Sequence, residues 1–215
     1  MNQALIPTRK AKLITLEGSE GAGKSTALKV VCQELDKWGV KYICTREPGG
    51  EPTAEKIREI LLHSEHLHAK TELLLMFASR NEHIENVIKP ALDSGKWVIS
   101  DRYVDASYAY QGGGRELGFE TVKWLDDFIV ADVQADFTLL MDIEPAIGLQ
   151  RIKVRGKADR IEQESIEFFN RIADAYRQKA KIESQRYAII DASKTIGQVT
   201  LDIQKALALA KKKIL

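Results

Sequence analysis

The sequence lacks the features that mark secreted, membrane-spanning and nucleic-acid-binding proteins. Only two of its 215 residues are cysteine, and Cys32 and Cys44 do not have the spacing of a metal site, so we expect two free thiols. The N-terminus has no apolar signal segment, and the longest strongly apolar run, residues 73–77, is far shorter than the roughly 20 residues that cross a bilayer. Lysine and arginine number 32 against 31 acidic residues, and a net charge of +1 does not favour nucleic acid as a partner. We therefore expect a cytoplasmic protein that binds neither membranes nor nucleic acids.

Nothing in the sequence separates two domains. It contains no fixed-period repeat, no low-complexity tract and no Pro/Ser-rich linker. At roughly 100–200 residues per domain, its length suits one large domain or two small ones. Hydrophobic residues make up 44% of the chain, which is enough for a substantial core. We expect a single domain over residues 1–215.

Short runs rich in β-branched residues alternate with longer amphipathic stretches. The runs predict strands at 13–16, 42–45, 97–100, 137–141 and 187–190. Helical spacing follows the first strand up to Gly39, and it recurs at about 54–62, 71–92, 119–130, 161–184 and 195–211. This alternation predicts an α/β fold, with a parallel sheet covered by helices on both faces.

A phosphate-binding loop follows the first predicted strand. Its GxxxxGK[ST] motif consists of Gly18, Ser19, Glu20, Gly21, Ala22, Gly23, Lys24 and Ser25. The glycines let successive backbone N–H groups surround phosphate oxygens at the positive end of the next helix. We expect Lys24 to reach the β- and γ-phosphates and the hydroxyl of Ser25 to hold Mg²⁺. The loop therefore predicts binding of a nucleotide together with Mg²⁺.

A P-loop protein also needs a carboxylate near the metal, and two acids follow apolar strands. They are Asp101, after the strand predicted at 97–100, and Asp142, after the strand predicted at 137–141. Asp101 is followed directly by Arg102, so a metal ligand and a phosphate-binding cation share one strand end, where open α/β sheets bind ligands. We favour Asp101 as the metal ligand and regard Asp142 as a structural acid.

The segment 151–160 concentrates positive charge. It holds five cations and one acid, a local charge of +4 in a chain whose total is +1. Such a segment is typical of a lid that closes over phosphates, although a solvated amphipathic stretch would have a similar pattern. The guanine-reading Asn-Lys-x-Asp element of regulatory GTPases is absent from the sequence. A lid and a second phosphate site favour a small-molecule kinase over a P-loop switch that hydrolyses nucleotide.

Five segments carry a resemblance to a known family. They are residues 17–25, 45–50, 101–103, 109–115 and 159–165. In this order they resemble the thymidylate kinase (dTMP kinase) family over nearly the whole chain, and a P-loop with an acid and no arginine resembles its bacterial-type variant. The resemblance implies a P-loop nucleoside monophosphate kinase fold, in which helices and a short basic lid flank a five-stranded parallel sheet. It also implies a homodimer that transfers the γ-phosphoryl group of ATP to dTMP, giving dTDP and ADP in dTTP biosynthesis.

The resemblance further implies which residues take part in catalysis. Lys24 and Arg102 would stabilise charge on the phosphates, and Arg102 would bind the acceptor phosphate. In the bacterial-type variant the lid supplies the catalytic arginines, for which Arg151, Arg155 and Arg160 are the candidates. Arginine suits this role because its planar guanidinium binds two phosphate oxygens at once.

A second set of residues is implied for binding dTMP. It comprises Glu20, Glu47, Arg58, Phe77, Arg80, Arg102, Ser107, Tyr110 and Gln111. Glu20 would lie near the sugar 3′-hydroxyl, and Tyr110 would lie beneath the deoxyribose, where a 2′-hydroxyl would clash. Arg80 would hydrogen-bond the edge of thymine, with Ser107 and Gln111 nearby.

The sequence departs from the family at the position that stacks on thymine. Related enzymes have Phe four residues before the base-reading Arg, whereas here Met76 is at that position and Phe77 lies three residues before Arg80. Either the helix adjusts so that Phe77 stacks on the base, or the thioether of Met76 covers it. The role of Arg58 is also undecided, because a solvated arginine on a helix would look the same in the sequence. The alternative function is phosphorylation of another nucleoside monophosphate.

Overall fold

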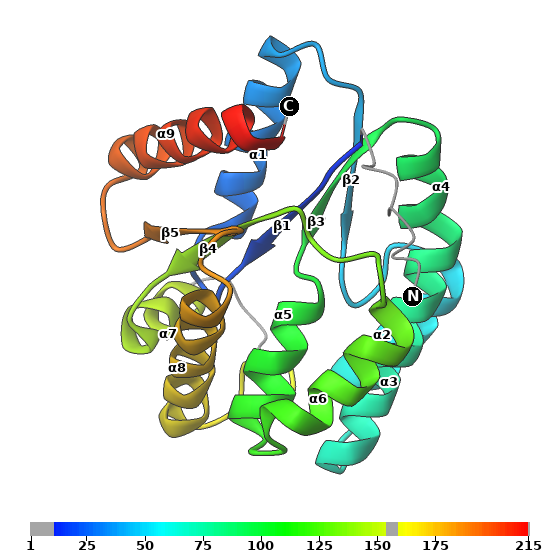
Figure 1. Ribbon diagram of the computed structural model, residues 1–215. Helices are drawn as coiled ribbons and strands as arrows, with labels where there is room; N and C mark the ends of the chain where they lie inside the picture. The colour runs from blue at the N-terminus through cyan, green and yellow to red at the C-terminus, as the bar shows by residue number, and fades with distance from the viewer. Residues whose placement is uncertain (1–10, 154–158, 215) are drawn as a thin grey trace.

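Five parallel strands form the central sheet of the computed structural model, which describes residues 11–153 and 159–214 (Figure 1). The strands are β1 (Leu13–Glu17), β2 (Tyr42–Arg46), β3 (Trp97–Asp101), β4 (Phe137–Asp142) and β5 (Tyr187–Asp191), in the order β2-β3-β1-β4-β5. All five predicted strands are confirmed, and each extends one residue further at its carboxyl end. The five added residues are Glu17, Arg46, Asp101, Asp142 and Asp191. All are charged, which is why hydrophobicity alone ended each strand one residue early.

β1 lies at the centre of the sheet. It pairs with β3 on one side, where Leu16 is opposite Asp101, and with β4 on the other, where Glu17 is opposite Leu140. These three strands are buried almost throughout, and their sequences are accordingly near-continuous apolar runs. Because β1 and β3 end side by side, the segments that follow them meet at one edge of the sheet.

Helices connect the strands and cover the sheet. They are α1 (Lys24–Lys37), α2 (Pro52–His63), α3 (Ala69–His83), α4 (Lys89–Asp93), α5 (Val104–Ser107), α6 (Phe119–Leu125), α7 (Pro145–Lys153), α8 (Ile166–Ile182) and α9 (Ile196–Ile214). The π-helical segments η1 (Ile84–Ile88), η2 (Tyr108–Gly114) and η3 (Asp126–Val130) continue α3, α5 and α6. α1 and α9 pack together on one side of the sheet, and α5, α7 and α8 lie on the other (Figure 1). The predicted α/β fold, with helices on both faces of a parallel sheet, is confirmed.

Some helices begin where periodicity did not place them. α8 begins after residue 161 because the hydroxyl of Ser165 caps it, accepting the N–H of Phe168 (3.3 Å). The preceding residues form a turn in which the carboxylate of Asp159 accepts two backbone N–H groups (both 2.9 Å). The helical stretch 104–114 was not predicted, because its glycine-rich end has low helix propensity.

The glycines of η2 let it pack closely against α8. A Cβ on Gly113 would lie 2.6 Å from the Cβ of Ala175, and a Cβ on Gly114 would lie 2.7 Å from the ring of Phe168. No other residue type would permit this approach. The contact positions the side chains of the same π-helical segment, a geometry that is frequent at functional sites.

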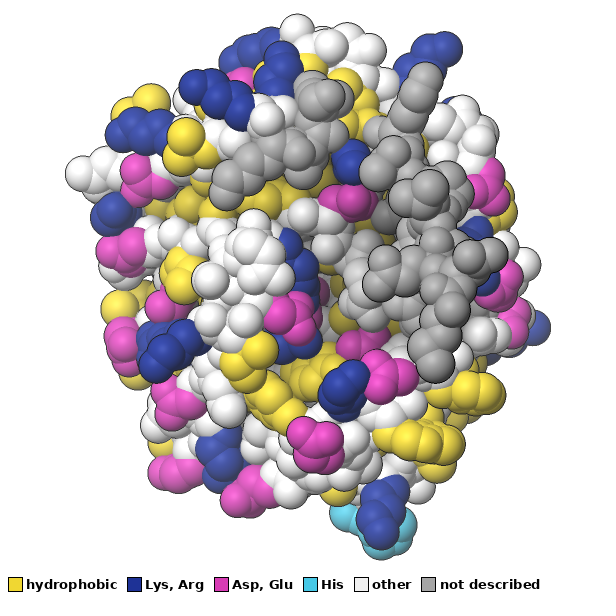
Figure 2. Space-filling model, in the orientation of Figure 1, with side chains coloured by type: hydrophobic (Ala, Val, Ile, Leu, Met, Phe, Trp, Pro, Cys, Tyr) yellow, Lys and Arg dark blue, Asp and Glu magenta, His cyan; other side chains and the backbone are white. Residues whose placement is uncertain are grey.

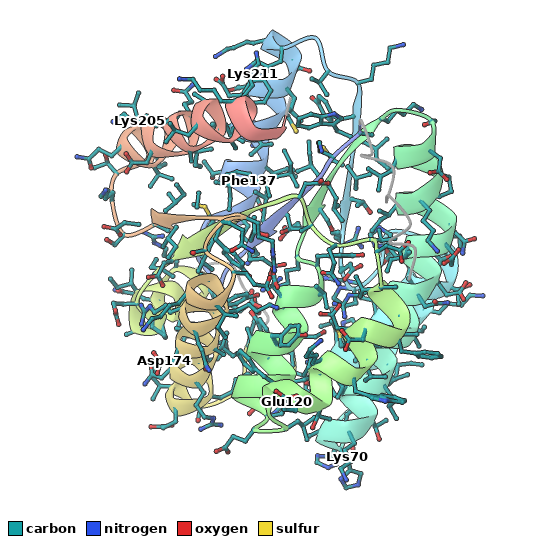
Figure 3. The ribbon with its side chains drawn as sticks, viewed as in Figure 1. Lys70, Glu120, Phe137, Asp174, Lys205 and Lys211 are labelled. Carbon is teal, nitrogen blue, oxygen red and sulfur yellow. The ribbon has the colours of Figure 1, made fainter. Side chains whose placement is uncertain are left out.

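The molecular surface agrees with the balanced composition. On the face shown in Figure 2, Lys and Arg side chains are interspersed with Asp and Glu. Lys211 on α9, labelled in Figure 3, lies over the ring of Trp38 with its Nζ 4.7 Å from the ring centroid. Gln204 of α9 donates to Glu34 of α1 (2.9 Å), so polar contacts also join these two helices. Among the helices of residues 11–153 and 159–214, none is both long and apolar enough to span a membrane.

Candidate active site

The P-loop connects β1 to α1. Gly18 and Gly21 have positive φ (140° and 71°), so the backbone adopts conformations that only glycine reaches easily. α1 begins at Lys24, whose Nζ donates to the carbonyl oxygens of Gly18 (2.9 Å) and Ser19 (3.1 Å). Burial and the neighbouring Arg102 lower the pKa of Lys24 to about 8. The loop therefore has the shape of a phosphate cradle, with its lysine drawn against the backbone.

A groove of about 320 Å³, here called the P-loop groove, runs along this loop. It is lined by Glu20, Gly21, Ala22, Gly23, Lys24, Ser25, Thr26, Asp101, Arg102 and Arg151. Arg151 of α7 donates to the carbonyl oxygens of Gly21 (3.3 Å) and Ala192 (3.1 Å). α7 comes this close because it meets the loop through a glycine: a Cβ on Gly21 would lie 2.1 Å from the carbonyl oxygen of Gly148. The structure thus brings most of the predicted ATP-binding residues together with Arg151.

The two predicted metal ligands, Ser25 and Asp101, both line the P-loop groove. The Oδ1 atom of Asp101 is buried and has no hydrogen-bond partner among the described residues, while Ser25 is exposed to the groove. Mg²⁺ prefers oxygen ligands, and in phosphate sites it takes only one or two from the protein. An unpaired carboxylate oxygen and a P-loop hydroxyl in one groove therefore fit Mg²⁺ bound with a nucleotide.

Arg102 lies between the P-loop groove and a second cavity. It follows β3 with a φ of 68°, which is uncommon for a residue other than glycine. Its guanidinium donates to the carboxylate of Glu20 and to the hydroxyl of Tyr110 (2.9 Å), and that hydroxyl donates to Glu20 (2.9 Å). Burial lowers the pKa of Arg102, but Glu20, Tyr110, Tyr176 and Asp101 together outweigh burial and raise the pKa well above its usual value. The guanidinium is therefore charged and held in one orientation.

The backbone at Arg102 is held by hydrogen bonds on both sides. Its own N–H donates to a carbonyl oxygen of β1 (3.0 Å), and the N–H of Tyr103 donates to Oε1 of Glu17 (2.8 Å). Glu17 is fully buried, and its Oε2 accepts the hydroxyl of Tyr176 (2.9 Å). Burial and the neighbouring Asp105 raise the pKa of Glu17 to about 8. Glu17 thus supports the strained backbone conformation that directs Arg102.

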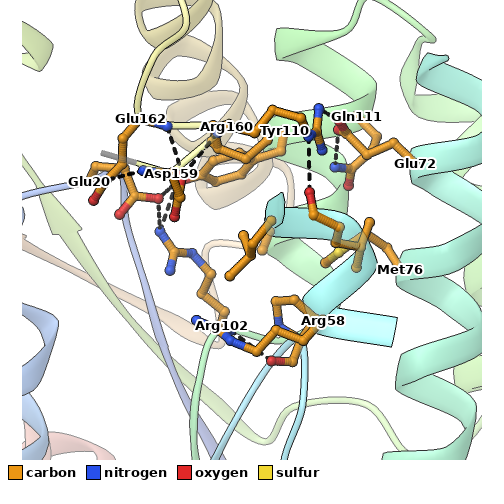
Figure 4. Close-up of a pocket in the computed structure, with 15 residues that line it drawn as sticks. Glu20, Arg58, Glu72, Met76, Arg102, Tyr110, Gln111, Asp159, Arg160 and Glu162 are labelled. Carbon is orange, nitrogen blue, oxygen red and sulfur yellow. Dashed lines mark hydrogen bonds and ion pairs between the residues drawn. The ribbon is translucent and has the colours of Figure 1, made fainter. Parts of the chain in front are cut away.

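The second cavity, here called the second pocket, has a volume of about 200 Å³ (Figure 4). It is lined by Glu20, Pro48, Arg58, Leu61, Leu62, Glu72, Met76, Arg102, Ala106, Tyr110, Gln111, Asp159, Arg160, Ile161 and Glu162. Five of the residues predicted to bind the acceptor are among them: Glu20, Arg58, Arg102, Tyr110 and Gln111. Arg58 lies in the wall of this pocket and donates to the carbonyl oxygen of Pro48 (2.8 Å), so it is not a solvated helix residue.

The other predicted acceptor residues do not line the second pocket. They are Glu47, Phe77, Arg80 and Ser107, and all four are buried. Arg80 donates from Nε to Glu47 (2.8 Å), from one terminal nitrogen to Ser107 (2.9 Å) and from the other to the carbonyl oxygen of Tyr103 (3.0 Å). The structure therefore joins Glu47, Arg80 and Ser107 in one cluster, but each nitrogen of the guanidinium already has a partner inside the protein.

Met76 and Phe77 point to different sides of α3. Met76 lines the second pocket, whereas Phe77 is 2% exposed in the hydrophobic core, with its ring centroid 4.7 Å from the guanidinium carbon of Arg80. α3 is a regular α-helix here, without the adjustment that would turn Phe77 toward the pocket. Of these two residues, only Met76 lines the second pocket.

Glu72 is a pocket residue that the sequence reasoning missed. It is 1% exposed, although it is an acid on a leucine-rich helix. A signal was present, because Glu72, Met76 and Arg80 recur every four residues and so share one helix face. When charged and apolar residues share one helix face, that face is buried, and its charged side chains need polar partners inside the protein.

The two described arginines of the basic segment 151–160 lie in different cavities. Arg151 lines the P-loop groove, while Arg160 lines the second pocket, where it pairs with Glu72 (2.8 Å) and donates to the carbonyl oxygen of Leu61 (2.9 Å). Arg155, the third predicted lid arginine, falls outside the described residues. Arg151 and Arg160 are therefore not side by side in one cavity, as two arginines of a single lid would be expected to be.

Comparisons with known proteins agree with this geometry. A family model described as thymidylate kinase matches residues 16–203, a region that contains every residue lining both cavities. A thymidylate kinase of Vesicomyosocius okutanii subsp. Calyptogena okutanii is 47% identical over 201 residues, which cover 93% of this chain and 98% of that protein. The thymidylate kinases of Ectopseudomonas mendocina and Methylobacillus flagellatus are 47% and 45% identical, over 90% and 91% of this chain and 93% and 98% of their own lengths.

Proposed function

This chain belongs to the thymidylate kinase family and phosphorylates dTMP to dTDP with ATP, and we propose that ATP binds in the P-loop groove and dTMP in the second pocket. The groove offers backbone N–H groups and Lys24 to the phosphates of the donor. The second pocket combines cationic side chains with an apolar wall, as a nucleoside monophosphate requires. Both sites lie at one edge of one sheet, so we also propose that residues 1–215 act as a single domain.

The observation that carries this assignment is that Arg102 and Glu20 line both cavities. A guanidinium between two sites can contact the acceptor phosphate and also the phosphoryl group that moves toward it. Positive charge held at that point stabilises the charge that spreads over the transferring group, which is the main contribution to catalysis in phosphoryl transfer. No general base is needed, because the acceptor phosphate is already an anion at neutral pH.

The wall of the second pocket complements a thymine base. Oε1 of Gln111 and one terminal nitrogen of Arg160 are buried without hydrogen-bond partners among the described residues. The N3–H group of thymine can donate to the first, and a ring carbonyl can accept from the second. Met76 would pack on the base, Tyr110 would lie beneath the deoxyribose, and Glu20 would lie near the 3′-hydroxyl.

The buried cluster of Glu47, Arg80 and Ser107 would support this pocket without touching the base. Arg80 links α3 to the segment after β3 through Tyr103 and Ser107, and Glu47 precedes Pro48 in the pocket wall. We therefore assign these three residues an indirect role in acceptor binding, in place of direct base recognition.

Mg²⁺ would be held by Ser25 and Asp101 and would neutralise charge on the β- and γ-phosphates of ATP. The unpaired Oδ1 atom of Asp101 supports this role. Of the two described lid arginines, Arg151 would act at the donor end because it lines the P-loop groove, whereas Arg160 would act at the acceptor end. A contact of Arg155 with the transferred phosphoryl group stays a prediction.

We also propose that the enzyme is a homodimer located in the cytoplasm. Trp124 on α6 and Phe128 on η3 are 68% and 72% exposed and stack with ring centroids 6.0 Å apart. Leu74, 58% exposed, is on α3, which packs against η3. Large exposed apolar side chains on adjacent elements are typical of an interface, which two copies would share by twofold symmetry. Phe128→Glu should sediment as a monomer, and a wild-type monomer at micromolar concentration would contradict the dimer.

The acceptor assignment is tested by an assay of ADP release with dTMP, dUMP, UMP, CMP and AMP as acceptors. We expect the highest kcat/KM with dTMP. A higher value for another monophosphate would favour the alternative kinase function. ADP release that is equally fast without any acceptor would instead indicate a nucleotide-hydrolysing switch.

A further inference from the structure

Glu72 is a carboxylate in the protein interior with three partners. It accepts a hydrogen bond from Nε2 of Gln111 (2.8 Å) and pairs with Arg160 (2.8 Å), and Figure 4 draws both residues. It also accepts hydrogen bonds from two nitrogens of Arg115 (3.2 and 3.1 Å). Burial raises the pKa of Glu72, but the hydrogen bonds from Arg115 and Gln111 outweigh it and hold the pKa below its usual value. Glu72 is therefore an ionised carboxylate, which can accept hydrogen bonds and cannot donate them.

An acceptor-only partner determines which way the amide of Gln111 faces. The NH₂ group must point to Glu72, because reversing the amide would bring two oxygen atoms together in a buried, low-dielectric environment. Oε1 of Gln111 then points away from Glu72. It is buried without a hydrogen-bond partner among the described residues, and Gln111 lines the second pocket. A residue of the pocket wall therefore carries a buried acceptor that has no partner among the described residues and whose direction is set by Glu72.

We propose that Glu72 is a positioning residue for base selectivity: it holds the carbonyl of Gln111 toward the acceptor base, so that the pocket takes bases with a hydrogen on N3 and rejects cytosine. The inference rests on the proposed function, in which the second pocket binds the acceptor nucleotide. N3 of thymine and uracil carries a hydrogen and donates to Oε1 of Gln111. N3 of cytosine carries a lone pair, so dCMP would set two acceptors against each other. Sites built to hydrogen-bond a substrate group reject analogues that lack it by about 10⁴–10⁵-fold.

The contacts of Glu72 with the two arginines have a different consequence. Arg160 is also held by the carbonyl oxygen of Leu61, and Arg115 is also held by Glu164 (2.6 Å). Loss of the contact with Arg115 would alter binding of every acceptor alike, because Arg115 does not line the second pocket. The ratio of two acceptors therefore separates the role of Glu72 in orienting Gln111 from a general structural role.

Glu72→Gln tests the inference, because it keeps the size of the side chain but offers a donor as well as an acceptor to Gln111. The measurement is kcat/KM for dTMP, dUMP and dCMP at saturating ATP. We expect the dTMP to dCMP ratio to fall by at least about tenfold, since the amide of Gln111 can then turn. The dTMP to dUMP ratio should stay within twofold, because the 5-methyl group is not read by Gln111.

Two further variants serve as controls. Glu164→Gln removes the other carboxylate partner of Arg115 without touching Gln111, and Glu72→Asp keeps an acceptor-only group at position 72. Both should retain the wild-type dTMP to dCMP ratio, even where absolute activity falls. A ratio that is unchanged in folded Glu72→Gln overturns the inference, as does an equal loss in Glu164→Gln.

Should Glu72→Gln fail to fold, Gln111→Leu decides the question. Loss of the dTMP to dCMP ratio in Gln111→Leu supports the inference, and an unchanged ratio overturns it. A wild-type preference for dUMP over dTMP would overturn the proposed acceptor but not this inference, because uracil also carries a hydrogen on N3. A wild-type preference for dCMP would overturn both.

Discussion

The P-loop groove and the second pocket share Arg102 but are built in different ways. Most of the groove is one continuous stretch, residues 20–26, in which backbone N–H groups would provide the proposed phosphate contacts. The second pocket takes its walls from separate stretches between residues 20 and 162, and it depends on side chains that are oriented by other side chains. A backbone site follows from a short motif and tolerates side-chain changes. A side-chain site can be altered by one substitution, so the two regions should respond differently to mutation and pH.

The largest effect is expected where the two regions meet. Arg102→Ala should lower kcat by about 10³-fold or more, because the transferring phosphoryl group would lose the guanidinium held between the two cavities. KM for ATP should change little, since the P-loop backbone and Lys24 are untouched. Arg102→Lys should recover only part of the loss, because lysine keeps the charge but not the planar fork. Steady-state kinetics on variants with native circular dichroism would check this, and a kcat within tenfold of wild type would contradict it.

Glu17, which supports the backbone at Arg102, should make the free energy of unfolding depend on pH. The pKa of Glu17 is raised from 4.5 to about 8. Between pH 4.5 and 8, Glu17 therefore keeps its proton in the folded protein but has lost it in the unfolded chain. The free energy of unfolding should therefore fall as pH rises to 8, by up to about 1.4 kcal/mol per pH unit from this group, or about 2 kcal/mol between pH 6 and 8. Glu17→Gln should remove this fall while still accepting the N–H of Tyr103. Urea denaturation of both proteins at several pH values would measure the difference, and parallel profiles would refute it.

Met76 and Phe77 sharpen the contrast between pocket wall and core. Phe77→Ala should lower the free energy of unfolding by about 3–5 kcal/mol and leave KM for dTMP near wild type, because Phe77 is packed in the core. Met76→Ala should instead raise KM for dTMP by about tenfold, with a smaller change in stability. Chemical denaturation and steady-state kinetics on both variants would separate the two effects. A loss of dTMP affinity in Phe77→Ala alone would return base stacking to Phe77.

The smallest predicted effect distinguishes donor from acceptor. Because the pKa of Lys24 is lowered to about 8, this side chain loses its proton as pH rises through 8, and its attraction for phosphate declines. KM for ATP should rise by up to about tenfold between pH 7.5 and 9, whereas KM for dTMP should stay flatter, because Arg102 keeps its charge. Since Glu17 titrates in the same range, Glu17→Gln is the matched background for this measurement. An equal rise of both KM values would contradict the assignment to Lys24.

The parts of the fold that could be predicted are those with a local pattern. The strands and the P-loop were legible because apolar runs, glycine spacing and a following helix are encoded in adjacent residues. The start of α8 was misplaced because the cap at Ser165 prevailed over hydrophobic periodicity. The glycine-rich η2 was not predicted as a helix, because glycine has low helix propensity. Its glycines are required by the close contact with α8, which the sequence does not show.

The second pocket shows what local patterns leave out. Sequence resemblance pointed to Arg80 as a base-reading residue, yet whether its guanidinium is free depends on Glu47, Ser107 and the carbonyl of Tyr103, which are distant in sequence. Glu72 was missed although it shares a helix face with Met76 and Arg80, because that spacing does not say which distant residues are its partners. Such residues acquire a role only when folding brings the partners within hydrogen-bond distance.

The sequence by itself determined the α/β fold, the phosphate-binding loop and the family, because each rests on spacing along the chain that any folded conformation must respect. Tertiary structure alone decided that Met76 rather than Phe77 faces the second pocket, that Arg151 and Arg160 line different cavities, and that Glu72 accepts a hydrogen bond from Gln111. These outcomes depend on which distant side chains folding brings together, and on the free-energy cost of leaving a buried polar group without a partner.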